Sequence, residues 1–326
     1  MSDLTALSDT CDPRAIPVAV FASSWVSDPD FAMTYSYLRA NGTPEDRQAL
    51  SVPSMGLQIA GEATWLKAPG TMHGAWFSGL RAADRVLAGG DGADKTPILK
   101  PVVQEFYDVV IVGAGLAGIA AARLLRSSGC KVVVLEASTT ALGRARGFTT
   151  PLGDVPLGGM WLHGTKTHPL MPFVHASGIP LVSDVWTVEN DDPLSITSPV
   201  FTQKGLLDSA SRDKEIARFR RLQQHLNATG SDRSLAENLL PPLRALDTGS
   251  RCVQETWFRT LYEGLVAGDL DDLSTTHRYE PFMLDGEDMM LAAPLSQAEP
   301  LFLEGLDVRF NTRVTDVVRD RGIWRV

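Results

Sequence analysis

The sequence has little cysteine and no long apolar run. Its three cysteines stand far apart in 326 residues, and none belongs to a CxxC pair. An odd, scattered set argues against a disulfide framework and against a zinc site with cysteine ligands. No apolar stretch reaches the roughly 18 residues that a membrane-spanning helix needs. The short apolar run at 16–25 follows acidic residues, not the basic residues of a signal peptide. We therefore predict a strand there, and a cytoplasmic protein.

Positive charge is also scarce. Thirty Lys and Arg residues stand against 39 Asp and Glu residues, for a net charge of −9. Nucleic acids and anionic membranes attract basic surfaces, so we expect neither as a partner. The acidic balance would mildly attract a cationic small molecule. GxSxG, HExxH and P-loop motifs are missing, and no His, Cys and carboxylate residues have metal-ligand spacing, so we predict no metal site.

The sequence does contain a glycine-rich turn between a strand and a helix. An apolar strand is predicted at 107–112, and a helix follows until Gly129 ends it before a second strand, KVVVLE. The turn carries the GxGxxG glycines Gly113, Gly115 and Gly118. In such a unit the first glycine allows the tight turn, the second lets a pyrophosphate approach the backbone, and the third lets helix and strand pack closely. We therefore predict a parallel βαβ unit that binds a dinucleotide.

The charged residues that follow narrow the choice of ligand. Glu136 ends the second strand, where a carboxylate accepts hydrogen bonds from ribose hydroxyls and repels a 2′-phosphate. We predict an adenine dinucleotide without a 2′-phosphate, and this unit alone leaves FAD and NAD open. Arg144 and Arg146 come next, at positions from which guanidinium groups can reach a pyrophosphate. Together with GGMWLHG at 158–164, they form a pattern that is not typical of nicotinamide-dependent enzymes.

Elements on both sides of this unit complete the expected architecture. Ahead of it, a strand is predicted at 57–60 and a helix at 74–88. After it, a charged amphipathic helix is predicted at 211–227 and a more apolar one at 251–266. The segment 305–320 alternates like a pair of strands and is expected to return to the sheet. The expected fold class is α/β.

This set of motifs resembles the flavin-dependent amine oxidases, a family that includes monoamine oxidases, polyamine oxidases and histone demethylases. The first half of such proteins carries a GxGxxG turn, a strand ending in Glu, a GGR motif and a D-x-G-x-x-W-x-H-G segment. The matching residues here are Gly113, Gly115, Gly118, Glu136, Gly143, Arg144, Gly158, Met160, Trp161, His163 and Gly164. The resemblance implies that the residues from Gly113 to Trp161 in this set line an FAD, and that the backbone of Val314 contacts its adenine. The pattern departs at Leu142, which stands where GGR has its first glycine.

The beginning of the chain resembles the opposite end of the same family. That end runs Trp-x-x-Asp, SYS, AGEAT and PGTxHGAxxSG, and the matching stretches here are Trp25 to Asp28, TYSY at 34–37, AGEAT at 60–64 and PGTMHGAWFSG at 69–79. The resemblance implies that this block lies against the flavin through Gly61, Glu62, Thr71 and Met72. It places Glu62 near the ribitol and pyrophosphate, and the backbone N–H of Met72 near flavin O2. A helix N-terminus there would stabilise negative charge on the reduced ring.

The resemblance also suggests which residues meet the substrate. Tyr35 falls where an aromatic wall of the substrate cage stands, with an ordinary sheet aromatic as the alternative interpretation. His163 either contacts a cationic amine or shapes the pocket. Thr34 stands where covalently flavinylated members carry Cys, so the FAD is expected to be non-covalent.

The two blocks stand in reversed order, which suggests a circular permutation in which both share one FAD site. The alternative is a chain that joins the tail of one oxidase to the head of another, with two separate sites. The permuted arrangement predicts a displaced C-terminal segment with substrate-domain and flavin-facing strands, a displaced FAD-binding strand and helix, a linker, an FAD-binding βαβ domain, a helix-rich substrate domain and a returning strand pair. Their ranges are 1–56, 57–89, 90–106, 107–165, 166–300 and 301–326.

The resemblance implies a reaction as well. A neutral amine loses hydride from its α-carbon to flavin N5, the imine hydrolyses, and O2 reoxidises the flavin to give H2O2. Family members continue after the segment matching 305–318 into a long substrate-domain stretch that has no match here. The implied fold is a Rossmann-like, glutathione-reductase-type FAD domain with an incomplete substrate domain of mixed sheet and helix. Either a second polypeptide supplies the missing strands, or the sequence is a fragment. The alternative function is a catalytically silent FAD-binding half-subunit that completes another chain.

Overall fold

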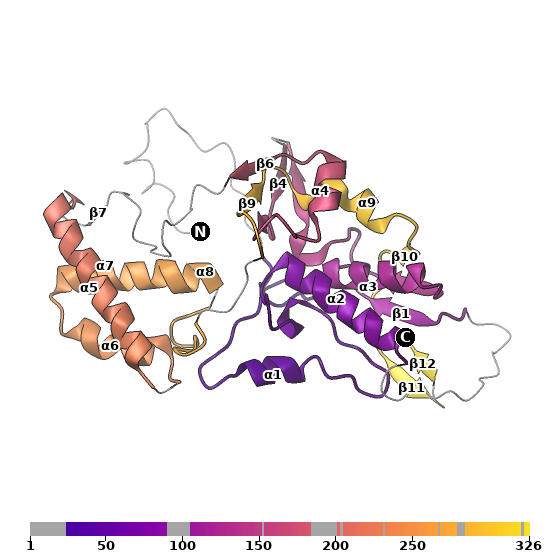
Figure 1. Ribbon diagram of the computed structural model, residues 1–326, viewed down its shortest axis with the longest axis horizontal. Coiled ribbons are helices and arrows are strands. Elements are labelled where there is room, and N and C mark those ends of the chain that lie inside the picture. Colours follow the sequence, from indigo (N-terminus) through magenta and orange to yellow (C-terminus); the bar gives the residue numbers. More distant parts are fainter. Residues whose placement is uncertain are drawn as a thin grey trace.

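The chain folds into two lobes, one built around a parallel sheet and one made of helices (Figure 1). The computed structural model describes residues 24–89, 105–151, 153–183, 201–202, 205–230, 232–266, 268–278, 284–320 and 323–326. Most of the strand predicted at 16–25 and of the linker predicted at 90–106 lies outside these ranges. Within them, no helix combines the length and the apolar character that crossing a membrane requires.

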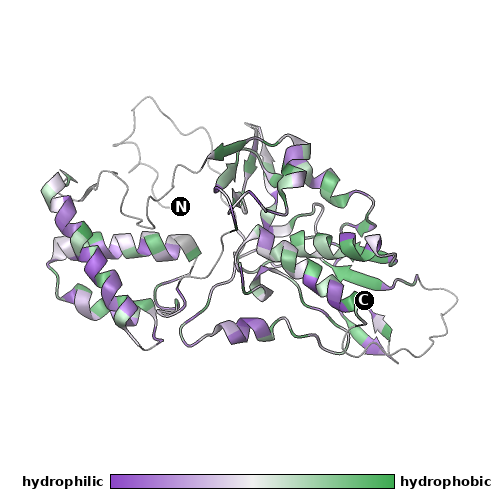
Figure 2. Ribbon diagram, viewed as in Figure 1, coloured by the Kyte–Doolittle hydropathy of each residue, from purple (hydrophilic) through white to green (hydrophobic). Residues whose placement is uncertain are grey.

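The sheet confirms the predicted βαβ unit. Its strands are β1 (Val109–Val112), β2 (Val132–Leu135) and β10 (Val308–Arg309), in the order β1-β2-β10 and all parallel. Helix α3 (Leu116–Ser127) connects β1 to β2. Strands β1 and β2 are continuous apolar runs, green in Figure 2, as expected of parallel strands that are covered on both faces. Of the strand pair predicted at 305–320, β10 returns to the sheet, whereas the end of the segment pairs with the last residues of the chain in a separate hairpin.

Small residues let the N-terminal block join this unit. Helix α2 (Met72–Leu87) packs along α3 with Gly79, Ala82 and Ala83 on its buried face. A Cβ at Gly79 would overlap the backbone carbonyl of Ala117. The two helix backbones therefore touch directly, and the helix predicted at 74–88 forms part of the sheet lobe.

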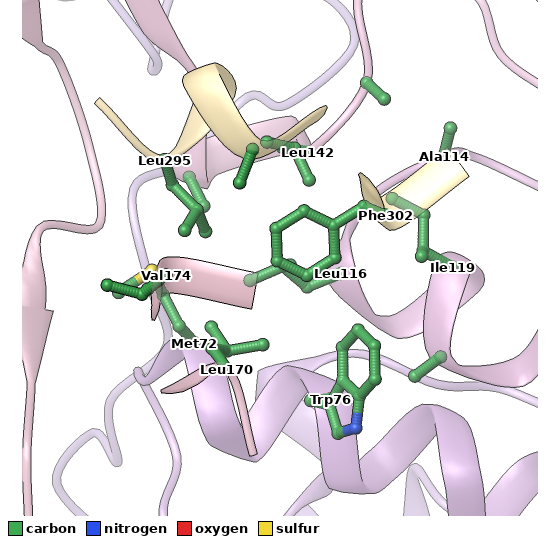
Figure 3. Close-up of a cluster of buried hydrophobic side chains, with 14 of the residues drawn as sticks. Met72, Trp76, Ala114, Leu116, Ile119, Leu142, Leu170, Val174, Leu295 and Phe302 are labelled. Atoms are coloured by element: carbon green, nitrogen blue, oxygen red, sulfur yellow. The ribbon is translucent and has the colours of Figure 1, made fainter. Parts of the chain in front are cut away.

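The core of the sheet lobe gathers residues from both ends of the chain (Figure 3). Trp76 of α2 packs edge-on against Phe302, with ring centroids 5.9 Å apart, and Phe302 stacks on Phe173 at 4.1 Å. Phe173 belongs to α4 (Met171–Ser177), and Phe302 belongs to α9 (Glu299–Leu303), which follows the short turn η6 (Leu295–Ala298). Phe173 near one end of the predicted substrate segment, and Leu295 and Ala298 near its other end, thus pack with the sheet lobe.

The middle of that segment forms the helical lobe. Its helices are α5 (Ser209–Ala228), α6 (Leu235–Arg244) and α7 (Thr248–Phe258), and α7 continues through the π-helical turn η5 (Arg259–Glu263) into α8 (Gly264–Val266). The helices predicted at 211–227 and 251–266 are thereby confirmed. Their buried faces meet in an aromatic cluster of Phe219, Phe258 and Tyr262. Figure 2 shows that most residues of α5 are hydrophilic.

Short elements frame these two lobes. A hairpin joins β3 (Gly147–Thr150) to β4 (Gly153–Pro156), and a three-stranded antiparallel sheet has the order β5 (Trp161–Leu162), β9 (Met289–Leu291), β6 (Leu181–Ser183). Two further hairpins are β7 (Phe201–Thr202) with β8 (Gly205–Leu206), and β11 (Val318–Asp320) with β12 (Ile323–Arg325). The remaining short helices are α1 (Pro44–Ala49), η2 (Glu62–Thr64) and η3 (Gly143–Ala145).

The strand predicted at 57–60 is wrong. Leu57 makes only an isolated bridge to Ser54, and the residues after it belong to no strand. A strand needs a neighbour for its backbone groups, and none of the described segments pairs with this one. Leu57 and Ile59 consequently stay 43% and 49% exposed.

Residues 38–41 link the N-terminal block to the helical lobe. Arg39 forms an antiparallel bridge with Leu273, and the amide of Ala40 donates to the carbonyl of Asp272 at 2.8 Å. The amide of Asn41 donates to the carboxylate of Asp232, also at 2.8 Å. The first block therefore contacts both lobes.

Candidate functional site

One large cleft, of about 2590 Å³, is lined by residues of both lobes and of the N-terminal block. This volume exceeds the range of about 300–1,000 Å³ that is usual for small-ligand pockets. Every residue predicted for the site lies on its wall: Tyr35, Gly61, Glu62, Thr71, Met72, Gly113, Gly115, Gly118, Glu136, Gly143, Arg144, Gly158, Met160, Trp161, His163 and Val314. The structure thus brings the two blocks to one cleft, and the individual roles of these residues stay predictions.

The glycine turn has the shape that a pyrophosphate requires. Gly113 follows β1 with a left-handed φ of +96°, and Gly115 caps the first turn of α3. A Cβ on either glycine would meet no atom within 4 Å, so both backbones face open space. A Cβ on Gly118 would instead overlap the carbonyl of Gly113. Gly113 and Gly115 therefore leave space for a ligand at the cleft, and Gly118 lets the helix pack closely against the turn. The amides at the helix N-terminus are suited to binding an anion.

The carboxylate predicted to bind ribose stands at the same end of the sheet. Glu136 follows β2, and its two oxygens accept hydrogen bonds from the amides of Ala114 at 2.7 Å and Ser138 at 2.8 Å. Its carbonyl accepts from the amide of Thr312 at 2.8 Å, two residues before Val314. These bonds fix the acid and the Val314 segment side by side on the wall of the cleft.

Glu62 ties the two blocks together at the middle of the cleft. Its side chain is buried and accepts hydrogen bonds from the amide of Ser36 at 3.1 Å, from the Ser36 hydroxyl at 2.6 Å and from the amide of Gly70 at 2.7 Å. Arg144 completes the set with an ion pair at 2.9 Å, and it also donates to the carbonyl of Thr34. A buried carboxylate needs such a set of donors, because burying it unpaired would be costly.

The turn that presents Arg144 holds an unusual backbone. Leu142 has a left-handed φ of +69°, a conformation that residues with a Cβ adopt rarely. It is the position at which the resembled motif has glycine. A Cβ on Gly158 would overlap the carbonyl of Arg144, so the segment that packs against this turn also needs glycine. The leucine is buried in the core, and that packing holds the strained turn.

A second helix N-terminus faces the same cleft. The Thr71 hydroxyl caps α2 by accepting from the amide of Gly74 at 2.9 Å, and Thr71 and Met72 line the wall. The first turns of α2 and α3 both carry partial positive charge. An elongated ligand with anionic groups is therefore favoured along this side of the cleft.

Aromatic and titratable side chains lie where a substrate was expected. Trp161 and His163 have parallel rings with centroids 6.4 Å apart. Burial raises the pKa of the Tyr35 phenol, which keeps it neutral. His163 Nδ1 lies 2.9 Å from Asp288 Oδ2, an acid that sequence reasoning missed. The signal available was its position just before β9, which pairs with the strand that precedes the histidine.

Sequence reasoning also missed the wall contributed by the helical lobe. Residues of α5 and of the α7–η5 helix line it at helical spacing: Arg212, Glu215, Ile216, Phe219, Val253, Thr256, Trp257 and Thr260. The spacing of three and four residues is visible in the sequence, but it does not say which side of a helix faces a ligand and which faces a core.

Two histidines meet at the start of α2, one of them in its first turn. His73 and His168 are buried, and their rings meet edge-on at 5.1 Å. Burial, and less so the neighbouring His73 and His163, lowers the pKa of His168 to about 3. In the part of the chain that the structure describes, no group of His, Cys, Asp and Glu is arranged to hold a metal ion.

Comparisons with known proteins match the two blocks separately. Residues 4–87 match the family model of flavin containing amine oxidoreductases, and residues 111–176 match that of an NAD(P)-binding Rossmann-like domain. The chain is similar to polyamine oxidase 2 of Arabidopsis thaliana, with 26% identity over 65% of this chain and 45% of that protein. It is also similar to lysine-specific histone demethylase 1 homolog 2 of Oryza sativa subsp. japonica, with 29% identity over 63% of this chain and 28% of that protein.

The chain thus spans less than half the length of these curated relatives. A solved structure of putrescine oxidase aligns with 65% of this chain and 52% of its own, at 19% identity and a TM-score of 0.42. Both matched segments line the cleft described above. The chain is thus similar, over these segments, to flavin containing amine oxidoreductases.

Proposed function

We propose that this chain binds FAD non-covalently and forms part or all of an enzyme that oxidises amines to imines, with O2 reduced to H2O2. One observation carries the proposal: the GxGxxG turn and Arg144 of one sequence block line the same cleft as Glu62 of the other block, and Glu62 and Arg144 form an ion pair. The cleft is large enough for a dinucleotide together with a substrate. The two family matches support it, since each covers one of these blocks.

The residues divide the work along the cleft. Glu136 would accept hydrogen bonds from the ribose hydroxyls, and the backbone at Val314 would lie beside the adenine. The amides at Gly115 and the start of α3 would bind the pyrophosphate, with Arg144 close by. The start of α2 would stabilise negative charge at the far end of the cofactor. When bound, FAD supplies the acceptor for the hydride that leaves the amine.

Tyr35, Trp161 and His163 form the proposed substrate side. Aromatic walls exclude water and orient an alkyl amine, while acidic side chains attract its cation. We name no catalytic base among these residues. We also infer that the two blocks share one site through a circular permutation. This is supported by contacts between them, including the Trp25 indole donating to the carbonyl of Leu157 at 3.0 Å.

A single glycine tests the cofactor proposal. The purified chain should elute from gel filtration as a yellow, monodisperse protein with flavin absorption bands, and it should form peroxide from an amine. Gly115→Ala places a methyl in the open space that the pyrophosphate would fill, without touching protein atoms. It should keep the unfolding midpoint and bind FAD at least about tenfold more weakly. A wild-type chain that stays colourless after reconstitution with FAD would contradict the proposal.

A second candidate is a partner protein that completes another chain. It is favoured by β1, which ends the sheet among the described strands. An open, apolar sheet edge favours pairing with a further strand. This candidate predicts a chain that is aggregated or silent alone and becomes monodisperse when the partner is added. Peroxide formation by the monodisperse chain alone would exclude it.

A further inference from the structure

Two short strands place an acid opposite a histidine on the wall of the cleft. Strands β5 and β9 pair antiparallel, with Trp161 opposite Met290 and Leu162 opposite Met289. One further step along both strands brings His163 opposite Asp288. Opposed side chains in an antiparallel pair lie on the same face, and here Nδ1 and Oδ2 are 2.9 Å apart.

The backbone around this pair fixes the acid. Asp288 Oδ1 accepts a hydrogen bond from the amide of Gly164 at 2.9 Å. Gly164 has a left-handed φ of +75°, and a Cβ there would overlap the carbonyl of Leu284. The amide can only donate, so one carboxylate oxygen is committed to it. The other oxygen is left to face the imidazole.

A carboxylate oxygen can only accept, which decides the tautomer of the histidine. On the neutral ring the proton must sit on Nδ1, and Nε2 becomes the acceptor. We propose that Asp288 is a positioning residue: it holds His163 in the Nδ1–H tautomer so that Nε2 accepts a hydrogen bond from the N–H of an amine in the cleft. The identity of the ligand as an amine rests on the proposed function.

The wall around the pair suits such a ligand. Trp161 lies parallel to the His163 ring, and Glu287 lines the same part of the cleft as Asp288. The indole offers an aromatic face to an alkyl chain or a cation. The acids add negative charge beside the acceptor, so a positively charged amine is attracted to the nitrogen that accepts its hydrogen bond.

Asp288→Asn should invert the tautomer. The asparagine keeps one acceptor oxygen, and the Gly164 amide must retain it because that amide cannot accept. The asparagine NH2 then faces His163 and donates to Nδ1, which forces the ring proton onto Nε2. Nε2 changes from acceptor to donor, while the size and packing of the side chain are preserved.

Nitrogen-15 NMR of the His163 imidazole reports directly which ring nitrogen carries the proton, with or without FAD. The chain has six histidines, so His163→Gln identifies the His163 signals by their loss. We expect the proton on Nδ1 in the wild type and on Nε2 in Asp288→Asn. Glu287→Gln, which removes the adjacent charge from an exposed side chain, should keep the wild-type tautomer. An unchanged tautomer in Asp288→Asn would overturn the proposal.

Titration with hexylamine tests the second part of the proposal, the hydrogen bond from an amine to His163 Nε2. In the wild type it should shift the Nε2 resonance, and Asp288→Asn should weaken that binding about tenfold, the size of one hydrogen bond to a charged group. Glu287→Gln should weaken it less than Asp288→Asn does. An Nε2 signal that does not respond to the amine would overturn the proposed contact. Failure to bind FAD, with both NMR results as expected, would count against the proposed function and leave this inference standing.

Discussion

The α2–α3 contact of the sheet lobe and the core of the helical lobe are packed in opposite ways. In the sheet lobe, backbones touch where side chains are absent: Gly79 lies against Ala117, and Gly118 against Gly113. In the helical lobe, large side chains fill the space, with Phe258 fully buried between its neighbours. The α2–α3 contact and the glycine turn of the sheet lobe therefore depend on residues that lack a Cβ, whereas the helical lobe and the aromatic core around Phe302 depend on residues that have bulk. The same type of substitution should have opposite consequences in the two.

The difference extends to the cleft. Its sheet-lobe wall includes the glycine turn and the N-termini of α2 and α3, alongside side chains such as Arg144. Its helical wall consists of side chains such as Ile216, Thr256 and Trp257, which differ in size and polarity. Backbone recognition is insensitive to side-chain changes, whereas a side-chain wall is easily altered. We therefore expect the helical wall to influence the preference for one amine over another, together with the proposed substrate side formed by Tyr35, Trp161 and His163.

The largest effect should come from Gly79→Ala. The added methyl collides with the backbone of α3, so the free energy of unfolding should fall by about 3 kcal/mol. The matched change is Gly249→Ala in the first turn of α7, where a Cβ meets only Asp247 Oδ1 at 3.4 Å. It should raise the free energy of unfolding by up to about 1 kcal/mol, because alanine favours helix. Urea unfolding measures both, and equal effects would remove the contrast between the lobes.

Two buried glutamates sharpen the comparison. Glu62→Gln removes the charge that Arg144 and three further donors satisfy, and should cost about 3 kcal/mol of stability and most of the bound FAD. Glu215→Gln disturbs a similar set in the helical lobe, with Ser250 at 2.8 Å and Gln254 at 2.9 Å. It should lower stability and leave FAD content unchanged. Loss of FAD in both variants would show that the lobes do not act separately.

Acid should weaken the sheet lobe through His168. Its folded pKa of about 3 lies below the unfolded value of about 6.5, so the unfolded chain binds more protons between these limits. This residue should therefore lower the free energy of unfolding by about 1.4 kcal/mol for each pH unit of decrease from 6.5 toward 3. His168→Gln should flatten that slope in urea unfolding between pH 6.5 and 4.5. A slope identical to the wild type would show that the ring is not neutral by burial.

The smallest effect should come from a helix cap in the helical lobe. Ser234 Oγ accepts from the amide of Glu237 at 3.2 Å, and the Glu237 carboxylate accepts from the amide of Ser234 at 3.1 Å. Ser234→Ala should cost about 1 kcal/mol in urea unfolding. Ser209→Ala, at an exposed position in the first turn of α5, should change stability by less than about 0.5 kcal/mol. Equal losses would mean that the cap contributes nothing specific.

Prediction from the sequence succeeded where a local pattern was sufficient. The glycine turn, α2, α3, α5 and the α7–η5–α8 helix follow from periodicity and from residues that only certain backbones admit, whereas α6 was not predicted. It failed at 57–60, because an apolar alternating run becomes a strand only if a neighbour pairs with it. It missed Asp288, because 125 residues separate it from His163.

The sequence by itself determined the dinucleotide turn, the acid that follows β2 and the family to which both blocks are similar, since each depends on a few neighbouring residues. Only the tertiary structure decided that both blocks line one cleft, that Glu62 pairs with Arg144, and that Asp288 faces His163. Those contacts depend on how strands register and helices pack across distant parts of the chain. Sequence spacing carries no record of such distances, because folding rather than local preference brings the residues together.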